Sequence, residues 1–210
     1  MRIIEGLLDL IFPKTCEKCG KVGNYICDNC YKNLEKHELN KWVKPGFIFS
    51  AYKYEGEIRE LILQYKFNDK SYLHKLFAEI LLKNKNVCKI LRSYDIIIPV
   101  PLHRKRKLSR GYNQCELILS EIANKIDTSK IEIDVLKKNK NIKPQSTKGY
   151  KERIENTKGV YNVENSWKIK NKSVLIFDDV YTTGSTVNEC KRVLKNAGAK
   201  RIGVLTLARD

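Results

Sequence analysis

The sequence predicts an α/β protein built on a parallel sheet that helices cover. Three short apolar runs are typical of buried strands: YDIIIPV at 94–100, SVLIFDD at 173–179 and RIGVLTLA at 201–208. Segments with apolar residues at helical spacing lie between them. Because two parallel strands need a crossover connection, usually a helix, this alternation indicates a parallel sheet that binds ligands at the carboxyl ends of its strands.

The remaining elements follow from the same two periodicities. IFSAYKY, at 48–54, and IEIDVLKKN, at 131–139, are each typical of a strand. Apolar residues recur every three or four positions in four other segments, which predicts helices over 57–65, 76–81, 115–126 and 187–197. We expect Gly198 to end the last of these helices. LHRKRKLSRGYNQ, at 102–114, is expected to be a loop.

Two polar stretches are predicted to connect these elements. Residues 31–47 are polar and end in a Pro-Gly pair, which indicates a linker. We therefore divide the chain into a small N-terminal module with its linker, residues 1–44, and a main domain, residues 45–210. Residues 140–165 are polar, basic and longer than most connections inside a compact domain. Such loops are usually functional or mobile.

The chain has 210 residues and a formal net charge of +17, from 41 basic and 24 acidic residues. This length allows one ordinary α/β domain with a small additional module. The charge favours phosphate-bearing partners such as nucleotides, nucleic acid or anionic lipid. The alternative is a general enrichment in lysine, since 31 of the 41 basic residues are lysines. Charge alone therefore supports an anionic partner only weakly.

The N-terminal apolar segment does not have the pattern of a secretion signal. Glu5 and Asp9 interrupt it, and no small-residue cleavage site follows. No stretch of the chain approaches the roughly 20 uninterrupted apolar residues that a membrane span requires. We therefore expect a cytoplasmic protein without a membrane span.

Four of the seven cysteines lie in CEKCGKVGNYICDNC, where Cys16 and Cys19 form one CxxC pair and Cys27 and Cys30 a second. Two such turns supply the four thiolates of a tetrahedral Zn²⁺ site. The alternatives are disulfides, which a reducing cytosol disfavours, and redox dithiols, which lack a thioredoxin-like context here. We predict a structural zinc site, because protein ligands fill all four positions.

The other three cysteines, Cys88, Cys115 and Cys190, are scattered among apolar neighbours. Free cysteine is among the most buried residue types and packs like a small apolar side chain. We expect three buried thiols without a chemical role.

The segment VLIFDDVYTTGST, at 174–186, combines a strand with polar groups suited to a ligand. At the end of a parallel strand, Asp178 and Asp179 should face the crevice where such sheets bind ligands. The carboxylates can accept hydrogen bonds from sugar hydroxyls or assist Mg²⁺. Backbone amides and hydroxyls at the start of the next helix can hold a phosphate. The residues predicted to hold it are Thr182, Thr183, Gly184, Ser185 and Thr186.

Each piece of this segment also has an ordinary structural interpretation. Two aspartates after a strand can form a solvated turn, and Thr or Ser before a helix often serves only as an N-cap. The segment is neither a Walker loop, which needs Gly-Lys-Ser/Thr, nor a GxGxxG turn. The combination in one register is more specific than its parts, and it indicates a ligand that carries both a ribose diol and a 5-phosphate.

At these residues the sequence resembles the type I phosphoribosyltransferases, whose ribose-phosphate motif it matches without a gap. That class binds phosphoribosyl pyrophosphate (PRPP) with Mg²⁺. Over nearly its whole length the chain resembles, more narrowly, the ComF family of competence proteins. The segments that carry this likeness are LIFPKTCEKCG, YKYEGEIRELILQYKF, PVPLHRKRKLSRGYNQ and KPQSTKGYKERIEN. The resemblance implies an α/β, parallel-sheet type I phosphoribosyltransferase fold with a small N-terminal zinc ribbon of four cysteines.

The resemblance also implies roles for two basic loops. The loop after the first core strand, around 101–113, would hold the pyrophosphate, with Arg104, Lys105 and Arg110 as its cations. The stretch 143–156 would close over the ligand, with Lys151 and Arg153 as charge partners. The alternative is that both are solvated basic loops.

Two functions are compatible with this resemblance. The first is a PRPP-binding protein of the ComF type that acts in natural competence, where it handles incoming single-stranded DNA together with proteins of the competence machinery. The second is an active, Mg²⁺-dependent transferase that moves phosphoribosyl from PRPP to an acceptor in nucleotide metabolism. The sequence identifies neither an acceptor pocket nor a general base, so the catalytic residues stay unassigned.

Overall fold

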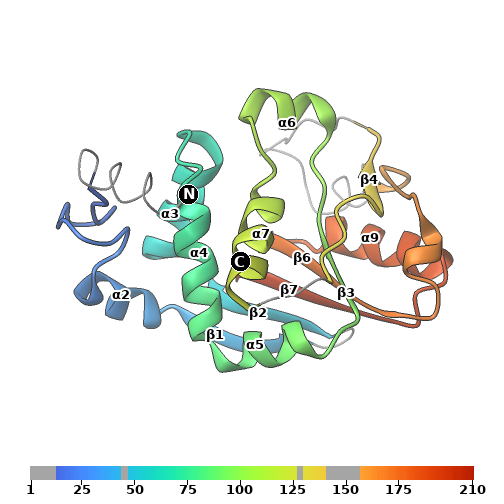
Figure 1. Cartoon of the computed structure of the whole chain (residues 1–210), viewed down its shortest axis with the longest axis horizontal. Helices are drawn as coiled ribbons and strands as arrows, with labels where there is room; N and C mark the ends of the chain where they lie inside the picture. The colour runs from blue at the N-terminus through green and yellow to red at the C-terminus, as the bar shows by residue number, and fades with distance from the viewer. Residues whose placement is uncertain (1–12, 44–46, 127–129, 141–156) are drawn as a thin grey trace.

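The computed structural model describes residues 13–43, 47–126, 130–140 and 157–210, and its main sheet has five strands (Figure 1). Their order across the sheet is β1-β2-β7-β6-β3. The strands span Glu38–Val43 (β1), Ile48–Lys53 (β2), Ile96–Pro99 (β3), Ser173–Tyr181 (β6) and Arg201–Arg209 (β7). Four of them run parallel, and β1 pairs antiparallel with β2 at one edge. The predicted parallel sheet is confirmed.

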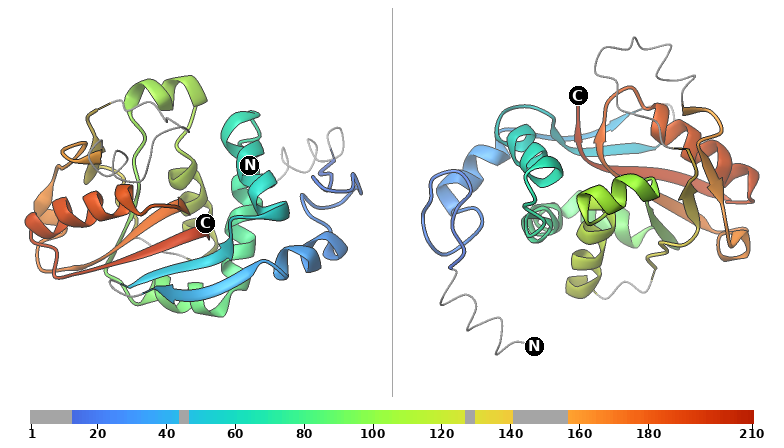
Figure 2. Two further views of the ribbon diagram at one scale, coloured as in Figure 1. Left: turned by 180° about the vertical axis from the view of Figure 1, so that it is seen from behind. Right: turned by 90° about the horizontal axis from the view of Figure 1, so that it is seen from above.

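Helices lie on both faces of this sheet (Figure 2). One face packs, through Ile97 and Phe177, against four helices. These are α3 (Gly56–Phe67), α4 (Leu73–Lys83), α5 (Lys85–Arg92) and α7 (Gln114–Ile126). The opposite face packs, through Ile98 and Ile176, against α9 (Ser185–Asn196). Neighbouring strand residues thus enter different cores, because side chains alternate along a strand.

A second, two-stranded sheet lies beside α9. It consists of β4 (Leu136–Lys138) and β5 (Tyr161–Val163), which pair antiparallel, and a short 3₁₀ turn, η1 (Ser166–Lys168), follows. The predicted strand 131–139 is therefore wrong in its extent. Of the residues before β4, Ile131 makes only an isolated bridge to Ile97. The strand is short because its partner, β5, offers three residues for pairing.

Three segments predicted as irregular contain regular structure, and one of them, the stretch 140–165, contains the strand β5. The expected linker 31–47 contains the end of helix α2 (Asp28–Glu35) and the strand β1. The mostly polar sequence of β1 hid this strand, which pairs with β2 at the edge of the sheet. The expected loop 102–114 contains helix α6 (Arg104–Arg110), none of whose residues is buried. Without a buried stripe, α6 has no helical periodicity to detect.

The other predicted elements form where expected. The helices α3, α4, α7 and α9 and the strand β2 cover the predicted segments, and Gly198 follows the end of α9 with a φ of +95°. The boundary between residues 44 and 45 stays a proposal, and β1 and β2, which lie on its two sides, pair with each other. Within the described residues, no helix has the length and apolar character needed to cross a membrane.

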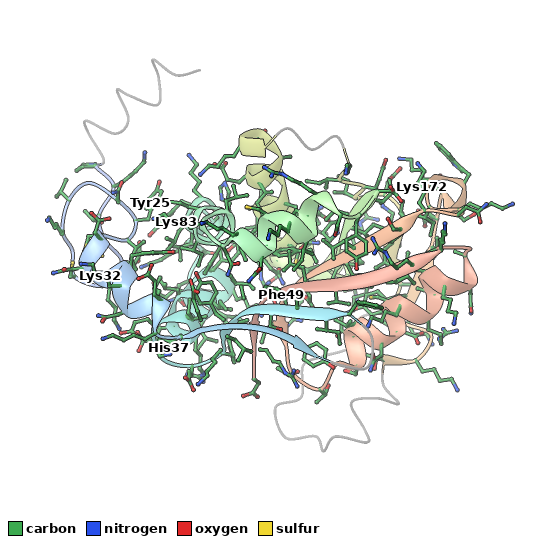
Figure 3. The ribbon with its side chains drawn as sticks, turned by 90° about the horizontal axis from the view of Figure 1, so that it is seen from below. Tyr25, Lys32, His37, Phe49, Lys83 and Lys172 are labelled. Atoms are coloured by element: carbon green, nitrogen blue, oxygen red, sulfur yellow. The ribbon has the colours of Figure 1, made fainter. Side chains whose placement is uncertain are left out.

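A buried pair of hydroxyls joins β2 to β7 in the interior. Ser50 and Thr206 are paired in register, are both fully buried, and their hydroxyl oxygens lie 2.7 Å apart. Phe49, the neighbour of Ser50, lies on the other side of β2 in the centre of the molecule (Figure 3). Each hydroxyl satisfies the other where water cannot reach, so neither can be removed alone without cost.

We expect Ser50→Ala to lower the free energy of unfolding by about 1 to 3 kcal/mol, because it leaves the Thr206 hydroxyl buried without its partner. The double variant S50A/T206V removes both hydroxyls while keeping the shape at Thr206 and should recover most of that loss. Urea unfolding of the two variants measures the difference. A double variant no more stable than S50A would contradict this account of the pair.

Candidate ribose-phosphate site and cysteine module

The paired aspartates lie where β6 extends beyond its neighbour β3. The β3–β6 ladder ends with Pro99 opposite Phe177, and the next two residues of β6 are Asp178 and Asp179. Both aspartates are buried, with 8% and 5% of their surface exposed. Their carboxylate oxygens therefore sit at the carboxyl end of the sheet, as the sequence predicts, but deeper than a solvated turn would place them.

Asp179 is held on both carboxylate oxygens. Its Oδ1 accepts a hydrogen bond from Lys66 Nζ of α3 at 2.9 Å, and its Oδ2 accepts one from Gln114 Nε2 of α7 at 2.7 Å. Burial acts to lower the pKa of Lys66, but the carboxylate of Asp179 outweighs burial and raises it. Lys66 is therefore a charged side chain in the interior, and Asp179 is its counter-ion.

Asp178 has a different environment. Burial raises the pKa of Asp178 to about 7, and the negative charge of Asp179 acts in the same direction. Its Oδ1 accepts a hydrogen bond from the backbone N–H of Asp179 at 2.9 Å. The thiol of Cys115 lies 3.9 Å from the same oxygen, and burial raises the pKa of that thiol well above its ordinary value. The two neighbouring carboxyls thus differ in their hydrogen-bond partners.

The hydroxyl-rich loop follows at the beginning of α9. Gly184 has a φ of +75°, and a Cβ there would collide with the hydroxyl of Tyr181, so the position requires glycine. The hydroxyl of Thr183 donates to that of Ser185 at 3.1 Å. Asp178 and the residues 180–187 line one small hollow. The loop, the positive end of the α9 dipole and one carboxylate therefore meet at a single place.

The small sheet contributes two further residues near this hollow. Lys138 of β4 lies with its Nζ 5.3 Å from the centre of the Tyr161 ring of β5. Burial lowers the pKa of Lys138, as does the nearby charge of Arg106. Asp178 is among the groups that favour its charged form. Lys138 is therefore a half-buried cation on the side of the site formed by the second sheet.

The predicted basic residues of the pyrophosphate loop lie on α6. Arg104 and Lys105 are exposed in its first turn. Arg110 donates from Nη1 to Gln114 Oε1 at 2.5 Å, and its guanidinium lies 5.6 Å from the centre of the Phe67 ring. The structure thus connects Arg110, through one side chain, with Asp179. The predicted closing loop, 143–156 with Lys151 and Arg153, lies outside the described residues.

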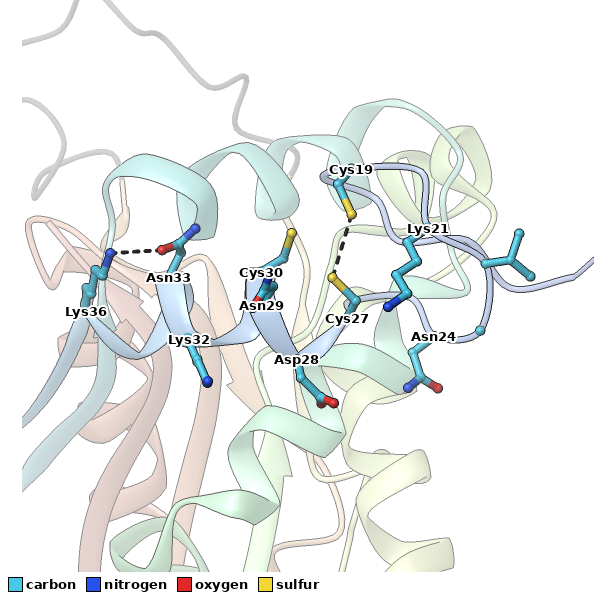
Figure 4. Close-up of a pocket in the computed structure, with 12 residues that line it drawn as sticks. Cys19, Lys21, Asn24, Cys27, Asp28, Asn29, Cys30, Lys32, Asn33 and Lys36 are labelled. Atoms are coloured by element: carbon cyan, nitrogen blue, oxygen red, sulfur yellow. Dashed lines mark hydrogen bonds between the residues drawn. The ribbon is translucent and has the colours of Figure 1, made fainter.

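The four N-terminal cysteines come together as their spacing predicts. The Sγ atoms of Cys16, Cys19, Cys27 and Cys30 lie within 4.8 Å of one another, and those of Cys19 and Cys27 are 3.6 Å apart (Figure 4). Burial acts to raise the pKa of Cys16, but hydrogen bonds from backbone N–H groups, first that of Cys27, outweigh it and lower the pKa to about 6. Such a cluster offers the four soft ligands of a tetrahedral metal site.

Beside the cysteines is an open hollow of about 900 Å³. Lysine and asparagine side chains line much of it, with Lys21, Lys32 and Lys36 as the cations (Figure 4). Lys36 donates to the amide oxygen of Asn33 at 2.9 Å. This surface is polar and mainly basic, which suits an anionic partner better than an apolar one.

Glu17, next to Cys16, attaches the cysteine module to the main domain. Its carboxylate accepts hydrogen bonds from Lys70 Nζ and from the Tyr72 hydroxyl, both at 2.5 Å. Tyr72 also stacks on Tyr25 of the module, with ring centres 5.1 Å apart. Of the remaining cysteines, Cys115 and Cys190 are buried as expected. Cys88 is only half-buried, because its thiol lies at the helix surface and donates to the carbonyl of Leu82.

Three residues of the site escaped sequence reasoning: Lys66, Gln114 and Lys138. Lys66 follows the apolar stripe of α3 and has the pattern of a solvated helix residue. Gln114 is the last residue of the basic segment 102–114. Nothing in its sequence context distinguishes it from a surface amide. Lys138 stands in a run of lysines. Their roles depend on contacts between residues far apart in the sequence, which no local pattern reports.

A parallel sheet with paired carboxylates at its carboxyl edge, followed by a hydroxyl-rich loop at a helix start, defines a protein of the type I phosphoribosyltransferase class. In agreement, the phosphoribosyl transferase domain family matches residues 113–210. Competence protein F of Haemophilus influenzae is 29% identical over 198 residues, which cover 92% of this chain and 84% of that protein. Over nearly its whole length the chain is similar to the competence proteins of the ComF family.

Two further relatives share the same extent. Competence protein ComFC of Streptococcus pneumoniae is 28% identical over 204 residues, which cover 92% of this chain and 87% of that protein. DNA utilization protein YhgH of Escherichia coli O6:H1 is 26% identical over 197 residues, which cover 92% of this chain and 83% of that protein. The similarity thus includes the cysteine module as well as the main domain.

Proposed function

We propose that this protein binds PRPP at the end of β6 and acts in the uptake and handling of single-stranded DNA. The observation that carries the proposal is the joint position of Asp178 and the loop 182–186 around one hollow. A carboxylate accepts hydrogen bonds from a ribose diol, whereas amides and hydroxyls at a helix start donate to a phosphate. PRPP carries both groups at a separation fixed by one sugar ring.

The charges around the hollow suit this ligand. Lys66 neutralises one of the two carboxylates, and Lys138 lies on the opposite side of the site. Both reduce the repulsion that a bare pair of aspartates would exert on phosphates. Carboxylate oxygens are also the donors that Mg²⁺ prefers, so Asp178 and Asp179 could hold Mg²⁺ that arrives with PRPP, where it would neutralise the pyrophosphate.

The relatives point to DNA uptake rather than to nucleotide metabolism. Two of them are named competence proteins and one a DNA utilization protein. The alternative, an active transferase of nucleotide metabolism, is not favoured by any of these names. Basic residues on α6 and beside the cysteines would supply phosphate contacts for single-stranded DNA. We place this activity in the cytoplasm, with competence-machinery proteins as partners.

The proposal includes a structural Zn²⁺ in the cysteine module. Four sulfur atoms within 4.8 Å of one another match a fully protein-liganded site. The module buries few apolar side chains, and two of them, Ile26 and Leu34, belong to the apolar cluster that also contains helices α3 and α4. Metal binding would compensate for the lack of a core within the module, since short segments rarely fold stably without such support.

For PRPP binding, the most direct variant is Asp178→Asn. It removes a carboxylate that forms no ion pair with any residue in the described ranges, whereas Asp179→Asn would leave the buried charge of Lys66 without its partner. We expect D178N to weaken PRPP binding in the presence of Mg²⁺ about tenfold or more, through loss of a charge-assisted hydrogen bond. Calorimetry measures this, with the exposed Asp210→Asn as control. Wild-type affinity in D178N would refute the site assignment.

For the metal, we expect the purified protein to contain about one Zn²⁺ per chain, since four thiolates fill one tetrahedral site. The double variant C27S/C30S should lose the metal and melt at a lower temperature, because half of the ligands are gone. Metal analysis and thermal unfolding measure both effects, with Cys88→Ser as a control thiol outside the cluster. If the purified wild type contained no metal and C27S/C30S melted at the same temperature as the wild type, the zinc site would be ruled out.

For DNA uptake, D178N can be tested in a naturally transformable strain that carries this chain in place of its own relative. If PRPP binding matters to the process, transformation frequency should fall at least about tenfold, in proportion to the loss of affinity. The D210N control and protein levels are measured in parallel. Normal transformation by a D178N protein that no longer binds PRPP would separate the site from DNA uptake.

A further inference from the structure

The last turn of α3 contacts the carboxylate site through a closed chain of side chains. Lys66 contacts Asp179, Asp179 contacts Gln114, Gln114 contacts Arg110, and Arg110 lies over Phe67, the residue after Lys66. The Tyr65 hydroxyl also donates to the backbone carbonyl of Gln114 at 3.0 Å. Three consecutive residues of α3 are therefore attached to the site and its neighbouring loop.

The Lys66–Asp179 ion pair is a largely buried member of this chain of side chains. The two side chains are 18% and 7% exposed, and the atoms Nζ and Oδ1 lie 2.9 Å apart. A charge in such a place requires a partner with good geometry, because water cannot solvate it. Lys66 of α3 and Asp179 of β6 are separated by 113 positions in the sequence. The ion pair therefore joins two distant parts of the chain at the site.

The pair also constrains the surroundings of Asp178. With Oδ1 on Lys66 and Oδ2 on Gln114, the Asp179 side chain cannot rotate freely. One carboxylate oxygen of Asp178 lies within 4.8 Å of one of Asp179, and Asp178 Oδ1 accepts a hydrogen bond from the backbone N–H of Asp179 at 2.9 Å. A fixed Asp179 side chain therefore limits the directions in which Asp178 can turn its carboxylate. Lys66 is thus placed to act on Asp178 through this intermediate residue.

We propose that Lys66 is a positioning residue of the ribose-phosphate site: its ion pair with Asp179 holds the two carboxylates in the arrangement that receives the ribose diol. This inference rests on the proposed binding of PRPP. Lys66 lies outside the residues 113–210 that match the phosphoribosyl transferase domain family. The N-terminal half of the chain would thus complete a site whose recognisable motif is in the C-terminal half.

The test compares Lys66→Met with Lys66→Arg. Methionine keeps most of the length of the side chain without its charge, whereas arginine keeps a cation that can bind a carboxylate. The control is Lys125→Met, which removes the same charge and an ion pair with Glu121 on α7. PRPP dissociation constants are measured by calorimetry at a temperature where every variant is fully folded.

We expect K66M to weaken PRPP binding about tenfold or more, as loss of a residue that orients a ligand-binding group commonly does. K66R should bind within about threefold of the wild type, because the charge is kept, and K125M should be unchanged. A K66M protein that melts at a lower temperature but binds PRPP as the wild type does would show that the ion pair is only structural. K66R as weak as K66M would equally refute a role based on charge.

A double variant tests whether Lys66 acts through Asp179. If it does, K66M/D179N should bind PRPP no more weakly than the weaker of the two single variants. Independent, additive losses would refute the proposed route. Failure of the wild type to bind PRPP would overturn the proposed function and this inference together, whereas normal wild-type binding with an unaffected K66M would overturn this inference alone.

Discussion

The length of β6 relative to β3 is the constraint on which the rest of the site depends. β3 has four residues and its ladder ends at Pro99, whereas β6 has nine and continues through both aspartates to Tyr181. Beyond Pro99, β3 no longer pairs with β6. Side chains of α3 and α7 contact β6 there instead. This is why a lysine of α3 and a glutamine of α7 can reach Asp179, and why the loop before α9 lies beside Asp178.

Two adjacent carboxylates at a buried strand end repel each other, and the fold resolves this by giving them different surroundings. Asp179 has a lysine counter-ion and an amide donor, one on each carboxylate oxygen. Asp178 forms no ion pair within the described residues, and burial raises its pKa to about 7. One carboxylate thus has both of its oxygens bonded to side chains of the protein, and the other is left for a ligand. The same separation of roles is common where titratable groups share a functional site.

The cysteine module is part of the same assembly. Glu17 follows Cys16 directly and is bonded to Lys70 and Tyr72, which lie between α3 and α4. The helix that carries Lys66 is therefore fastened at its C-terminal side to the module and, through the ion pair, to β6. Each of the three relatives matches 92% of the chain, so the similarity extends beyond the main domain.

The sequence by itself determined the parallel sheet, the cysteine cluster and the position of Asp178 and Asp179, because each rests on a local pattern: apolar runs, CxxC spacing and a strand that ends in carboxylates. It could not show β1, whose sequence is mostly polar, or α6, none of whose residues is buried. Only the tertiary structure decided which carboxylate is paired. Lys66 and Asp179 are 113 positions apart, and an ion pair at that separation depends on the packing of α3 against the sheet, which no periodicity within either segment records.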